Sequence, residues 1–427
     1  MIENINFRTG IGASILRAAQ AALVEIPHKV YEASRQSHSF RPQLVTGILE
    51  RDRGLVNAKL LGIDPQTWIS GADLEFNPRQ WLLLGNPLLA SLVTKTIGDR
   101  WIDHLDHLQQ LVPLAEDPLL QSRWRAVKQV NKQALANYLE RAQGVKINVS
   151  SLFDLQLQPI VEHQRQLLNI LHIITLFNQI KQHPGIDIVP RTFIFGNLGE
   201  IESSLLQRGY CKGKCFATAN ESQIDQDGQL QPNPNQEMIS LIQSLAQVFA
   251  HDSDVNSKLQ VVYVPNSAGL TTQMYAAADL TQEIAAAAIE DVDLSKVKAA
   301  INGVLSIGSL GKTNYWLQQT VGEQNYFSFG LPIPEIALFK EYGYDPYNYY
   351  KHYPEIRQAV DCLLTGYFTP EHPTLCKSLL DTLFGTDDQM ILADYIFYIT
   401  CQARVSATYR QQSLWTKMSI LNVAGVG

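Results

Sequence analysis

Segments typical of strands and helices alternate along the middle of this 427-residue sequence. The predicted strands either alternate polar and apolar residues or form short apolar runs; they span 154–160, 189–195, 260–265 and 304–308. The predicted helices between them span 162–183, 236–251 and the alanine-rich run 284–289. Strands separated by helices pair in parallel, with helices over both faces of the sheet. The pattern therefore predicts an α/β fold with a doubly wound, Rossmann-like parallel sheet.

Extra helices are predicted at both ends of this α/β region. Asn77-Pro78 and Asn86-Pro87 each place a capping asparagine before a proline, which is typical of a helix start. Residues after 315 are predicted to be mostly helical, and residues 1–75 to form a divergent segment with short helices in 11–24 and 40–61. We expect the main domain to span 76–427, with a long polar insertion at 197–235.

Composition restricts the class of protein. The net charge of −7 argues against a nucleic-acid partner, because such proteins usually carry a basic face. There is no run of 18 apolar residues, so no membrane span is expected. The first residues lack the pattern of a signal peptide, and five cysteines do not make a disulfide framework. We therefore expect a cytoplasmic protein.

Two lysines stand between a predicted helix and a predicted strand, where α/β proteins place ligands. Lys296 and Lys298 lie in the segment 290–303, beside apolar sequence. A buried lysine with a lowered pKa can carry a carbonyl compound as a Schiff base. A solvated lysine with no chemical role is the commoner case, and the residues alone leave both interpretations open.

An acidic cluster stands just before these lysines. Glu290, Asp291 and Asp293 could position a cation or act as acid/base groups, or they could be solvated charges at the end of a helix.

Two weaker patterns contain metal-ligand residue types. Cys211 and Cys215 lie in the insertion, and His104 and His107 lie three residues apart in a predicted helix. A single pair of such residues is weak evidence for a metal site. We expect no metal site.

Several stretches resemble the glycogen (α-glucan) phosphorylase family. Those in the first part are Asn77-Pro78-Arg79-Gln80-Trp81-Leu82, Ser151-Leu152-Phe153-Asp154, Arg165-Gln166-Leu167-Leu168-Asn169 and Val189-Pro190-Arg191-Thr192. Those in the second part are Ala277-Ala278-Asp279-Leu280, Phe329-Gly330-Leu331, Gly366-Tyr367-Phe368-Thr369-Pro370, Ala393-Asp394-Tyr395 and Trp415-Thr416-Lys417. The match is collinear from about 77 to 425. It implies the C-terminal, cofactor-carrying half of a GT-B glycosyltransferase, without the family's large N-terminal domain.

The resemblance also implies a cofactor position. The family holds pyridoxal phosphate on a lysine that follows a glycine-rich segment, and Lys298 falls on that lysine. Glu290 falls on a glutamate that contacts the sugar, and Asn302-Gly303 match as well. The glycines are replaced by 291–296, which includes two aspartates. Glycine-rich turns let backbone N–H groups approach a phosphate, whereas carboxylates repel it.

This sequence differs even more from the family in a second element, which binds phosphate groups in the family. Three cations that hold the cofactor and substrate phosphates there are replaced by Gln158, Pro159 and Gln164, while Arg165 is kept. Each charge-assisted hydrogen bond is worth about 1.5–3 kcal/mol, so three losses would weaken phosphate binding severely. His163 stands where the family has tyrosine. It could act as a general base, or it could be an ordinary helix histidine.

Three hypotheses follow for the function. The first is a degenerate phosphorylase paralogue that does not phosphorolyse glucan and acts in binding or regulation. The second is a repurposed enzyme that uses Glu290, Asp291, Asp293, Lys298 and His163 on a different small molecule. The third is residual sugar transfer with a partner that supplies the other half-site. We expect a sugar or small molecule in the cleft, a homodimer or a hetero-partner, and no pyridoxal phosphate on Lys298.

Overall fold

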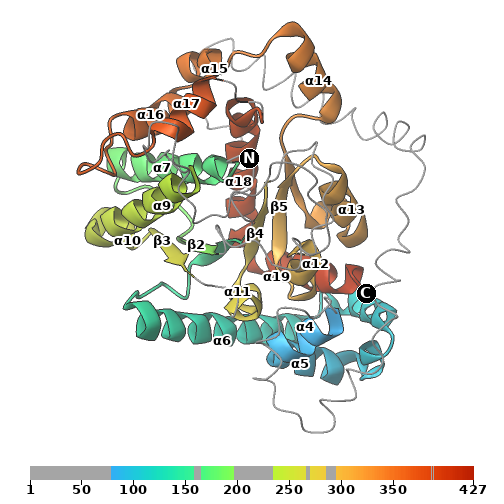
Figure 1. The fold of residues 1–427 in the computed structure, drawn as a ribbon. Helices are drawn as coiled ribbons and strands as arrows, with labels where there is room; N and C mark the ends of the chain where they lie inside the picture. The colour runs from blue at the N-terminus through green and yellow to red at the C-terminus, as the bar shows by residue number, and fades with distance from the viewer. Residues whose placement is uncertain are drawn as a thin grey trace, which may run out of the picture. The chain divides into compact units, whose positions relative to one another are not determined.

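Six parallel strands form a single sheet in the computed structural model, which describes residues 78–157, 165–196, 234–265, 270–284, 295–385, 387 and 389–427. The strands are β1 (Leu152–Gln156), β2 (Arg191–Gly196), β3 (Leu259–Val264), β4 (Leu280–Glu283), β5 (Leu305–Ser309) and β6 (Phe327–Phe329). Their order is β3-β2-β1-β4-β5-β6, and every neighbouring pair is parallel (Figure 1). This is the order of a Rossmann-type sheet, so the predicted fold class is confirmed.

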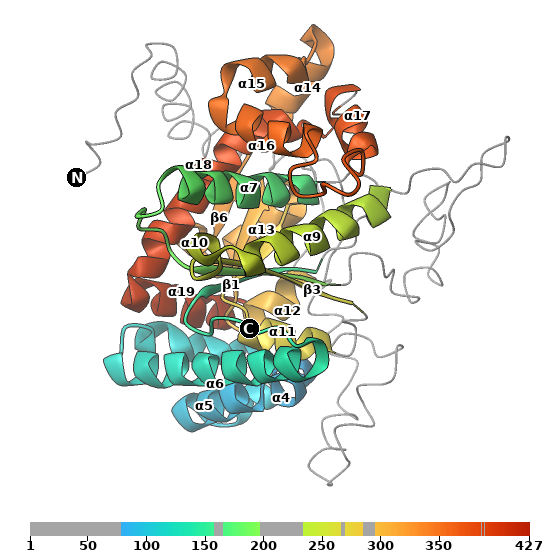
Figure 2. The same cartoon turned by 90° about the vertical axis from the view of Figure 1, so that its left-hand side faces the viewer.

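Helices cover both faces of the sheet, because side chains alternate between the two faces along each strand. Strand residues such as Leu152, Leu280 and Leu305 share one apolar core with the helices on their side. These helices are α7 (Gln166–Gln182), α9 (Pro234–His251), α16 (Pro354–Leu364), α17 (Lys377–Gly385) and α18 (Ile391–Arg410). Phe153 and Leu155 point to the other face, into a second core. The helices there are α6 (Pro118–Gln143), α11 (Thr271–Ala277) and α12 (Ser295–Ile301), and Figure 2 shows the two sets on opposite sides of the sheet.

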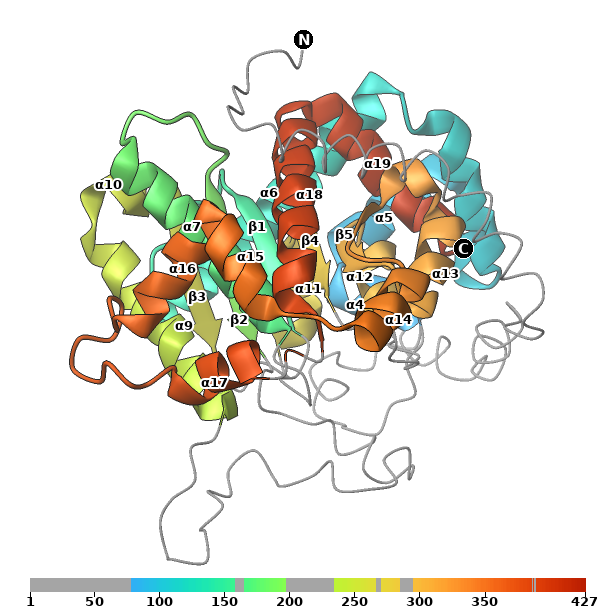
Figure 3. The same cartoon turned by 90° about the horizontal axis from the view of Figure 1, so that it is seen from above.

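The remaining described helices lie around these two layers (Figure 3), and two of them also add Val255, Trp415 and Met418 to the first core. At the amino-terminal side they are α4 (Pro78–Gly85), α5 (Pro87–Ile97) and the 3-10 turns η2 (Arg100–Ile102) and η3 (Leu105–Leu114). Between and after the strands they are α10 (Ser253–Asn256), α13 (Lys312–Val321), η5 (Glu323–Asn325), α14 (Ile333–Tyr342), α15 (Pro346–His352) and α19 (Gln412–Gly425). None of the described helices is long and apolar enough to cross a membrane.

Helix boundaries follow the capping signals in the sequence. The Asn86 side chain accepts a hydrogen bond from the Leu89 N–H at 3.3 Å, Pro87 is the first residue of α5, and Gly98 ends it with φ +84°. Asp117 caps α6 in the same way through the Leu120 N–H at 2.7 Å. Such caps satisfy backbone donors that have no partner within the helix.

The strands β4 and β6 were not predicted. The sequence of β4, Leu-Thr-Gln-Glu, has one apolar residue, and its polar side chains are buried against other polar groups. Gln282 illustrates this, since its Nε2 donates to Asp154 Oδ1 at 2.6 Å and its Oε1 accepts from the Tyr398 hydroxyl at 2.9 Å. The prediction of a helix starting at Ile284 is wrong at that residue, which follows β4 in a non-helical conformation. Residues 285–289 lie outside the described residues.

A buried ion pair extends this polar network across the sheet. Arg191 on β2 donates from Nη1 to Asp154 Oδ2 at 3.2 Å and to Gln402 Oε1 on α18 at 2.6 Å. Burial raises the pKa of the Asp154 carboxyl to about 6, although Arg191 and Gln282 act in the opposite direction. The network therefore joins three strands to α18 through polar groups that are removed from water.

Several predictions fall outside the described residues. They are the short helices in 11–24 and 40–61, the end of the first predicted strand at 158–160, and the insertion up to residue 233. The helix α9 begins at Pro234, inside the predicted insertion and two residues earlier than predicted.

Candidate active site

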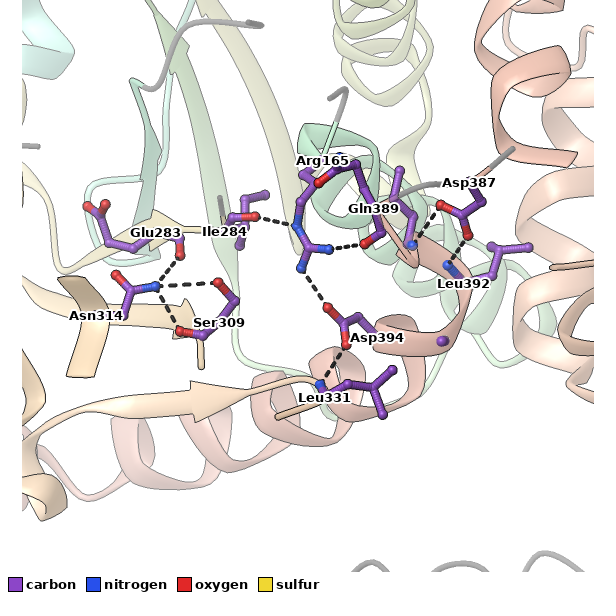
Figure 4. Close-up of polar contacts among 12 residues, drawn as sticks. Arg165, Glu283, Ile284, Ser309, Asn314, Leu331, Asp387, Gln389, Leu392 and Asp394 are labelled. Carbon is purple, nitrogen blue, oxygen red and sulfur yellow. Dashed lines mark hydrogen bonds and ion pairs between the residues drawn. The ribbon is translucent and has the colours of Figure 1, made fainter. Parts of the chain in front are cut away.

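The candidate site lies at the carboxyl ends of β1 and β4, which are neighbours in the centre of the sheet. The chain leaves β1 for α7 and β2 on one side, and it leaves β4 for α12 and β5 on the other side. Open α/β sheets bind ligands at such a switch point, because the diverging connections leave a crevice between the strand ends. The described residues around it are drawn in Figure 4.

Arg165 links several chain segments at this edge of the sheet. It precedes α7, and its side chain is 4% exposed. Its Nε donates to the carbonyl of Ile284 after β4 at 2.7 Å, and its Nη1 donates to the carbonyl of Gln389 at 2.5 Å. Its Nη2 pairs with Asp394 Oδ2 at 2.7 Å (Figure 4). The guanidinium is thus neutralised by a buried carboxylate and held by two backbone carbonyls.

Asp394 extends this contact to the end of β6. Its Oδ1 accepts a hydrogen bond from the Leu331 N–H at 2.7 Å. Gly330 has φ +94°, and a Cβ there would lie 3.0 Å from Asp394 Oδ1. Only glycine adopts this backbone without strain, so Gly330 lets the chain turn closely over the carboxylate. One ion pair therefore positions the chain after β4, after β6 and before α18.

Asp387 stabilises the start of α18 beside this pair. Its carboxylate accepts hydrogen bonds from the Ile391 N–H at 2.8 Å, the Leu392 N–H at 3.2 Å and the Tyr344 hydroxyl at 2.6 Å. Burial raises its pKa to about 6 despite these donors. The carboxylate satisfies backbone N–H groups that have no partner within the helix, so its role here is structural.

The ends of β4 and β5 are tied together by one amide. Asn314 Nδ2 on α13 donates to the carbonyl of Glu283 at 3.0 Å and to the carbonyl of Ser309 at 2.8 Å (Figure 4). Gly308 lies against this amide, and a Cβ there would overlap the Tyr326 hydroxyl and lie 2.8 Å from Asn314 Nδ2.

A second amide pair lies at the end of β1. Asn169 Nδ2 on α7 donates to Gln156 Oε1 at 2.8 Å, and both side chains are buried. The polar groups described at the carboxyl edge are therefore amides, hydroxyls and carboxylates. Its arginine, Arg165, is already paired with Asp394.

Of the five residues predicted to carry catalysis, Lys298 is the one among the described residues. It lies on α12, is half-buried, and its Nζ is 4.7 Å from the centroid of the Trp81 ring on α4. The Asn302 side chain donates to the carbonyl of Lys298 at 2.9 Å and accepts from Asn86 Nδ2 at 3.0 Å. The Asn302-Gly303 motif thus fixes the end of the helix that carries the lysine. Lys296, its neighbour on α12, is 4% exposed.

Glu290, Asp291, Asp293 and His163 lie outside the described residues, so their predicted roles stay predictions. The same holds for Cys211 and Cys215. The rings of His104 and His107 are 6.0 Å apart. No group of three metal-ligating side chains occurs in the described part of the chain.

Sequence reasoning did not find the ion pair between Arg165 and Asp394 or the tie through Asn314. The two charged residues are 229 positions apart, and no periodicity connects them. The motifs Arg165-Gln166-Leu167-Leu168-Asn169 and Ala393-Asp394-Tyr395 contained both residues, but they gave no sign that the two side chains pair.

The strand order defines a Rossmann-like α/β protein, with polar groups gathered at the switch point between β1 and β4. The family model for carbohydrate phosphorylase matches residues 75–200 and 233–427. A glycogen phosphorylase of Synechocystis and the muscle glycogen phosphorylase of Oryctolagus cuniculus are each 36% identical over 351 residues. This chain belongs to the carbohydrate phosphorylase family, and its sheet fits the GT-B fold that the resemblance implied.

The match covers unequal shares of the two proteins. It takes in 82% of this chain and 38% of each of these relatives. The chain therefore spans well under half the length of the curated relatives it matches.

Proposed function

We propose that this chain is a phosphorylase-family protein that does not phosphorolyse glucan and that acts by binding a sugar or another small molecule, in a regulatory or sequestering role. The proposal rests on the relationship to proteins named glycogen phosphorylases and on the loss of cations from the predicted phosphate sites. We also propose that residues 76–427 form the ligand-binding domain and that 1–75 are a separate, divergent segment.

The proposal rests on the hydrogen bonds and the ion pair that the Arg165 side chain already makes. Gln158, Pro159 and Gln164 replace the three cations that the resemblance implies as phosphate contacts. Arg165 is not one of those three, but it is the cation of that element that remains to interact with a phosphate. Its guanidinium is buried and paired with Asp394 and two carbonyls. Freeing it for a phosphate would leave Asp394 as an unpaired buried carboxylate, which typically costs about 3–5 kcal/mol. The described side chains at this edge are therefore expected to bind a phosphate group only weakly.

The residues present do not fit pyridoxal phosphate. Lys298 could supply an amine for the cofactor's carbonyl carbon, but its Nζ lies against the Trp81 ring. Arg165, at the carboxyl edge of the sheet, is paired with Asp394. The sequence before Lys298 supplies Asp291 and Asp293 in place of a glycine-rich phosphate loop.

Phosphate consumption tests the loss of phosphorolysis. The 427-residue chain is incubated with maltodextrin and inorganic phosphate, with the rabbit muscle relative as the positive control. We expect no phosphate consumption by this chain. Phosphate consumption that rises with enzyme concentration would overturn the proposal.

A variant that restores the lost cations sharpens this test. The triple substitution Gln158→Lys, Pro159→Arg and Gln164→Lys returns the three positive charges. We expect it to bind inorganic phosphate at least tenfold more tightly than the wild type in calorimetry, because charge-assisted bonds are about 1.5–3 kcal/mol each. Equal affinity for both proteins would show that the substitutions at these positions do not explain the loss.

An absorbance titration tests the cofactor separately. Pyridoxal phosphate is added to the wild type and to Lys298→Ala, and difference spectra are recorded. We expect the two proteins to give the same spectrum. An imine band present only in the wild type would show that Lys298 carries the cofactor.

Repurposed enzyme chemistry is the second candidate, because Lys298 is kept half-buried beside an aromatic ring. In that case Glu290, Asp291, Asp293 and His163 would supply acid/base groups for a reaction on a less anionic substrate. A screen of sugars and other small molecules that finds turnover abolished by Glu290→Ala would favour this candidate. Binding without turnover would favour the first.

Residual sugar transfer with a partner is a third candidate, because the chain covers 38% of its relatives' length. Sedimentation of the chain alone tests whether it forms a homodimer. A monomer that gains glycosyl transfer only when a second protein is added would favour the hetero-partner version.

A further inference from the structure

One face of the sheet is polar where β4, β5 and β6 lie side by side. Ser306 pairs with Thr281, and Gly308 pairs with Glu283 in the neighbouring strand. Tyr326 lies directly before β6, whose pairing with β5 begins at Ile307 and Phe327. Since alternate residues share a face, these side chains belong to one side of the sheet. The buried residues there are Thr281, Glu283, Ser306, Gly308 and Tyr326.

Three polar atoms in this region are buried and have no hydrogen-bond partner among the described residues. They are Ser306 Oγ, Asn314 Oδ1 and Tyr326 Oη. The three residues are 0%, 4% and 3% exposed, respectively. Buried hydroxyl and amide groups nearly always have a partner, because losing their hydrogen bonds to water costs about 1–3 kcal/mol each. Three such atoms in one region need an explanation.

The orientation of the Asn314 amide is fixed by its neighbours. Its nitrogen donates to the carbonyls of Glu283 and Ser309, and both of these groups only accept. Turning the amide over would replace two hydrogen bonds with two repulsive contacts between oxygen atoms. In the view of Figure 4, Asn314 Oδ1 points away from Ser309, on the same side as the Glu283 carboxylate.

Gly308 brings two of the three groups close together. A Cβ at this residue would meet Tyr326 Oη first and then Asn314 Nδ2 at 2.8 Å. The phenol hydroxyl therefore occupies the place that a side chain at residue 308 would take, with the amide nitrogen of Asn314 beside it. Burial raises the pKa of Tyr326 well above 10, so the hydroxyl stays protonated and can donate as well as accept.

We propose that this polar face binds an internal water, held by Tyr326, Asn314 and Ser306 next to Gly308. A water donates to the amide oxygen and exchanges hydrogen bonds with both hydroxyls, which neither an anion nor an apolar group can do. Internal waters typically make about three hydrogen bonds to buried groups of this kind. Because the same amide ties Glu283 to Ser309, the water stabilises the carboxyl ends of β4 and β5 beside the candidate site.

A crystal structure of the 427-residue chain tests the site directly. We expect a water peak within about 2.7–3.2 Å of Tyr326 Oη, Asn314 Oδ1 and Ser306 Oγ. Continuous packing with no density between these atoms would overturn the proposal. A cation, recognised by shorter contacts and by a melting temperature that depends on potassium or sodium, would overturn it as well.

Two substitutions give an independent test by thermal unfolding. Tyr326→Phe and Ser306→Ala each remove one hydroxyl and no other polar atom. If the hydroxyls bind water, each variant should melt about 1–4 °C below the wild type. If the hydroxyls have no partner, each variant should melt at the same temperature or higher, because an unsatisfied buried group has been removed.

Two matched tyrosines calibrate this comparison. The Tyr398 hydroxyl donates to Gln282 Oε1 and accepts from Gln402 Nε2, both at 2.9 Å, so Tyr398→Phe should lower the melting temperature. Tyr367 is 54% exposed, so Tyr367→Phe should leave it unchanged. A Tyr326→Phe variant that behaves like Tyr367→Phe would contradict the water site.

Discussion

Two ion pairs of this chain differ in burial, and the difference predicts how each responds to loss of its charge. Arg165 and Asp394 are 4% and 5% exposed, whereas Lys377 and Asp381 are 71% and 64% exposed. Asp394→Asn removes the carboxylate charge that is hydrogen-bonded to the buried Arg165 guanidinium. We expect the free energy of unfolding to fall by about 3–5 kcal/mol, measured by urea denaturation.

Asp381→Asn is the matched control for that variant. It removes the same carboxylate charge from a pair that water and salt already screen. We expect its unfolding curve to overlay that of the wild type. If Asp394→Asn and Asp381→Asn lost the same stability, the buried pair would not hold the carboxyl edge together.

The buried carboxyl of Asp154 makes a prediction about pH. Burial raises its pKa from 3.8 to about 6, so the folded state binds a proton more tightly than the unfolded state does. Stability is then greatest below pH 3.8 for this group and falls as the pH rises to about 6. The slope is at most about 1.4 kcal/mol per pH unit for one proton. Asp154→Asn should flatten the measured decline of unfolding free energy in this window.

Asp387 contributes to the same window with the same sign, because burial also raises its pKa to about 6. Asp154→Asn should therefore reduce the slope without abolishing it. A variant with the wild-type slope would show that Asp154 is ionised in both states throughout this range.

At the scale of elements, the turn from α12 into β5 depends on Gly303. This residue has φ +65°, and a Cβ there would lie 2.5 Å from Ser419 Oγ. In Gly303→Ala, an alanine would have to adopt a left-handed backbone conformation. Its Cβ would also displace the Ser419 side chain of α19. We expect a loss of about 2–4 kcal/mol in unfolding free energy, as the sum of these two effects.

Gly144→Ala separates the two effects. Gly144 ends α6 with φ +71°, and a Cβ there would meet nothing within 4 Å. This variant should lose only the backbone contribution, about 1–2 kcal/mol. If both variants lost the same unfolding free energy, the Ser419 side chain would be moving aside without destabilising the protein.

Four of the six strands could be predicted from the sequence, each to within two residues at its start. They are the strands with apolar alternation or apolar runs. The other two had no such signal, because β4 buries polar side chains in a network and β6 spans three residues. Local pattern cannot reveal a strand whose burial depends on Asp154 and Tyr398, which are more than a hundred positions away.

The candidate site was predictable only in part, for the same reason. Lys298 could be singled out because the matching motif continues through Asn302-Gly303. The switch point itself could not be deduced, since it lies between β1 and the unpredicted β4. The commitment of Arg165 to Asp394 requires knowledge of the tertiary fold.

At the scale of the whole molecule, ligand binding should appear as a change in stability. A ligand that binds only the folded chain raises its stability by an amount set by concentration and affinity. At ten times its dissociation constant, maltodextrin should raise the melting temperature by about 1–4 °C. Pyridoxal phosphate at equal concentration should have no specific effect. A larger rise in melting temperature with pyridoxal phosphate than with maltodextrin would contradict the proposed function.

The contacts of Arg165 also determine how the carboxyl edge can move. The segments after β4 and before α18 bond to one guanidinium directly, and the segment after β6 bonds to its carboxylate partner. A shift of any one segment must therefore stretch the bonds to the others or carry them with it. We therefore expect these three segments to move together, so that a ligand displacing one of them also strains the hydrogen bonds to the other two.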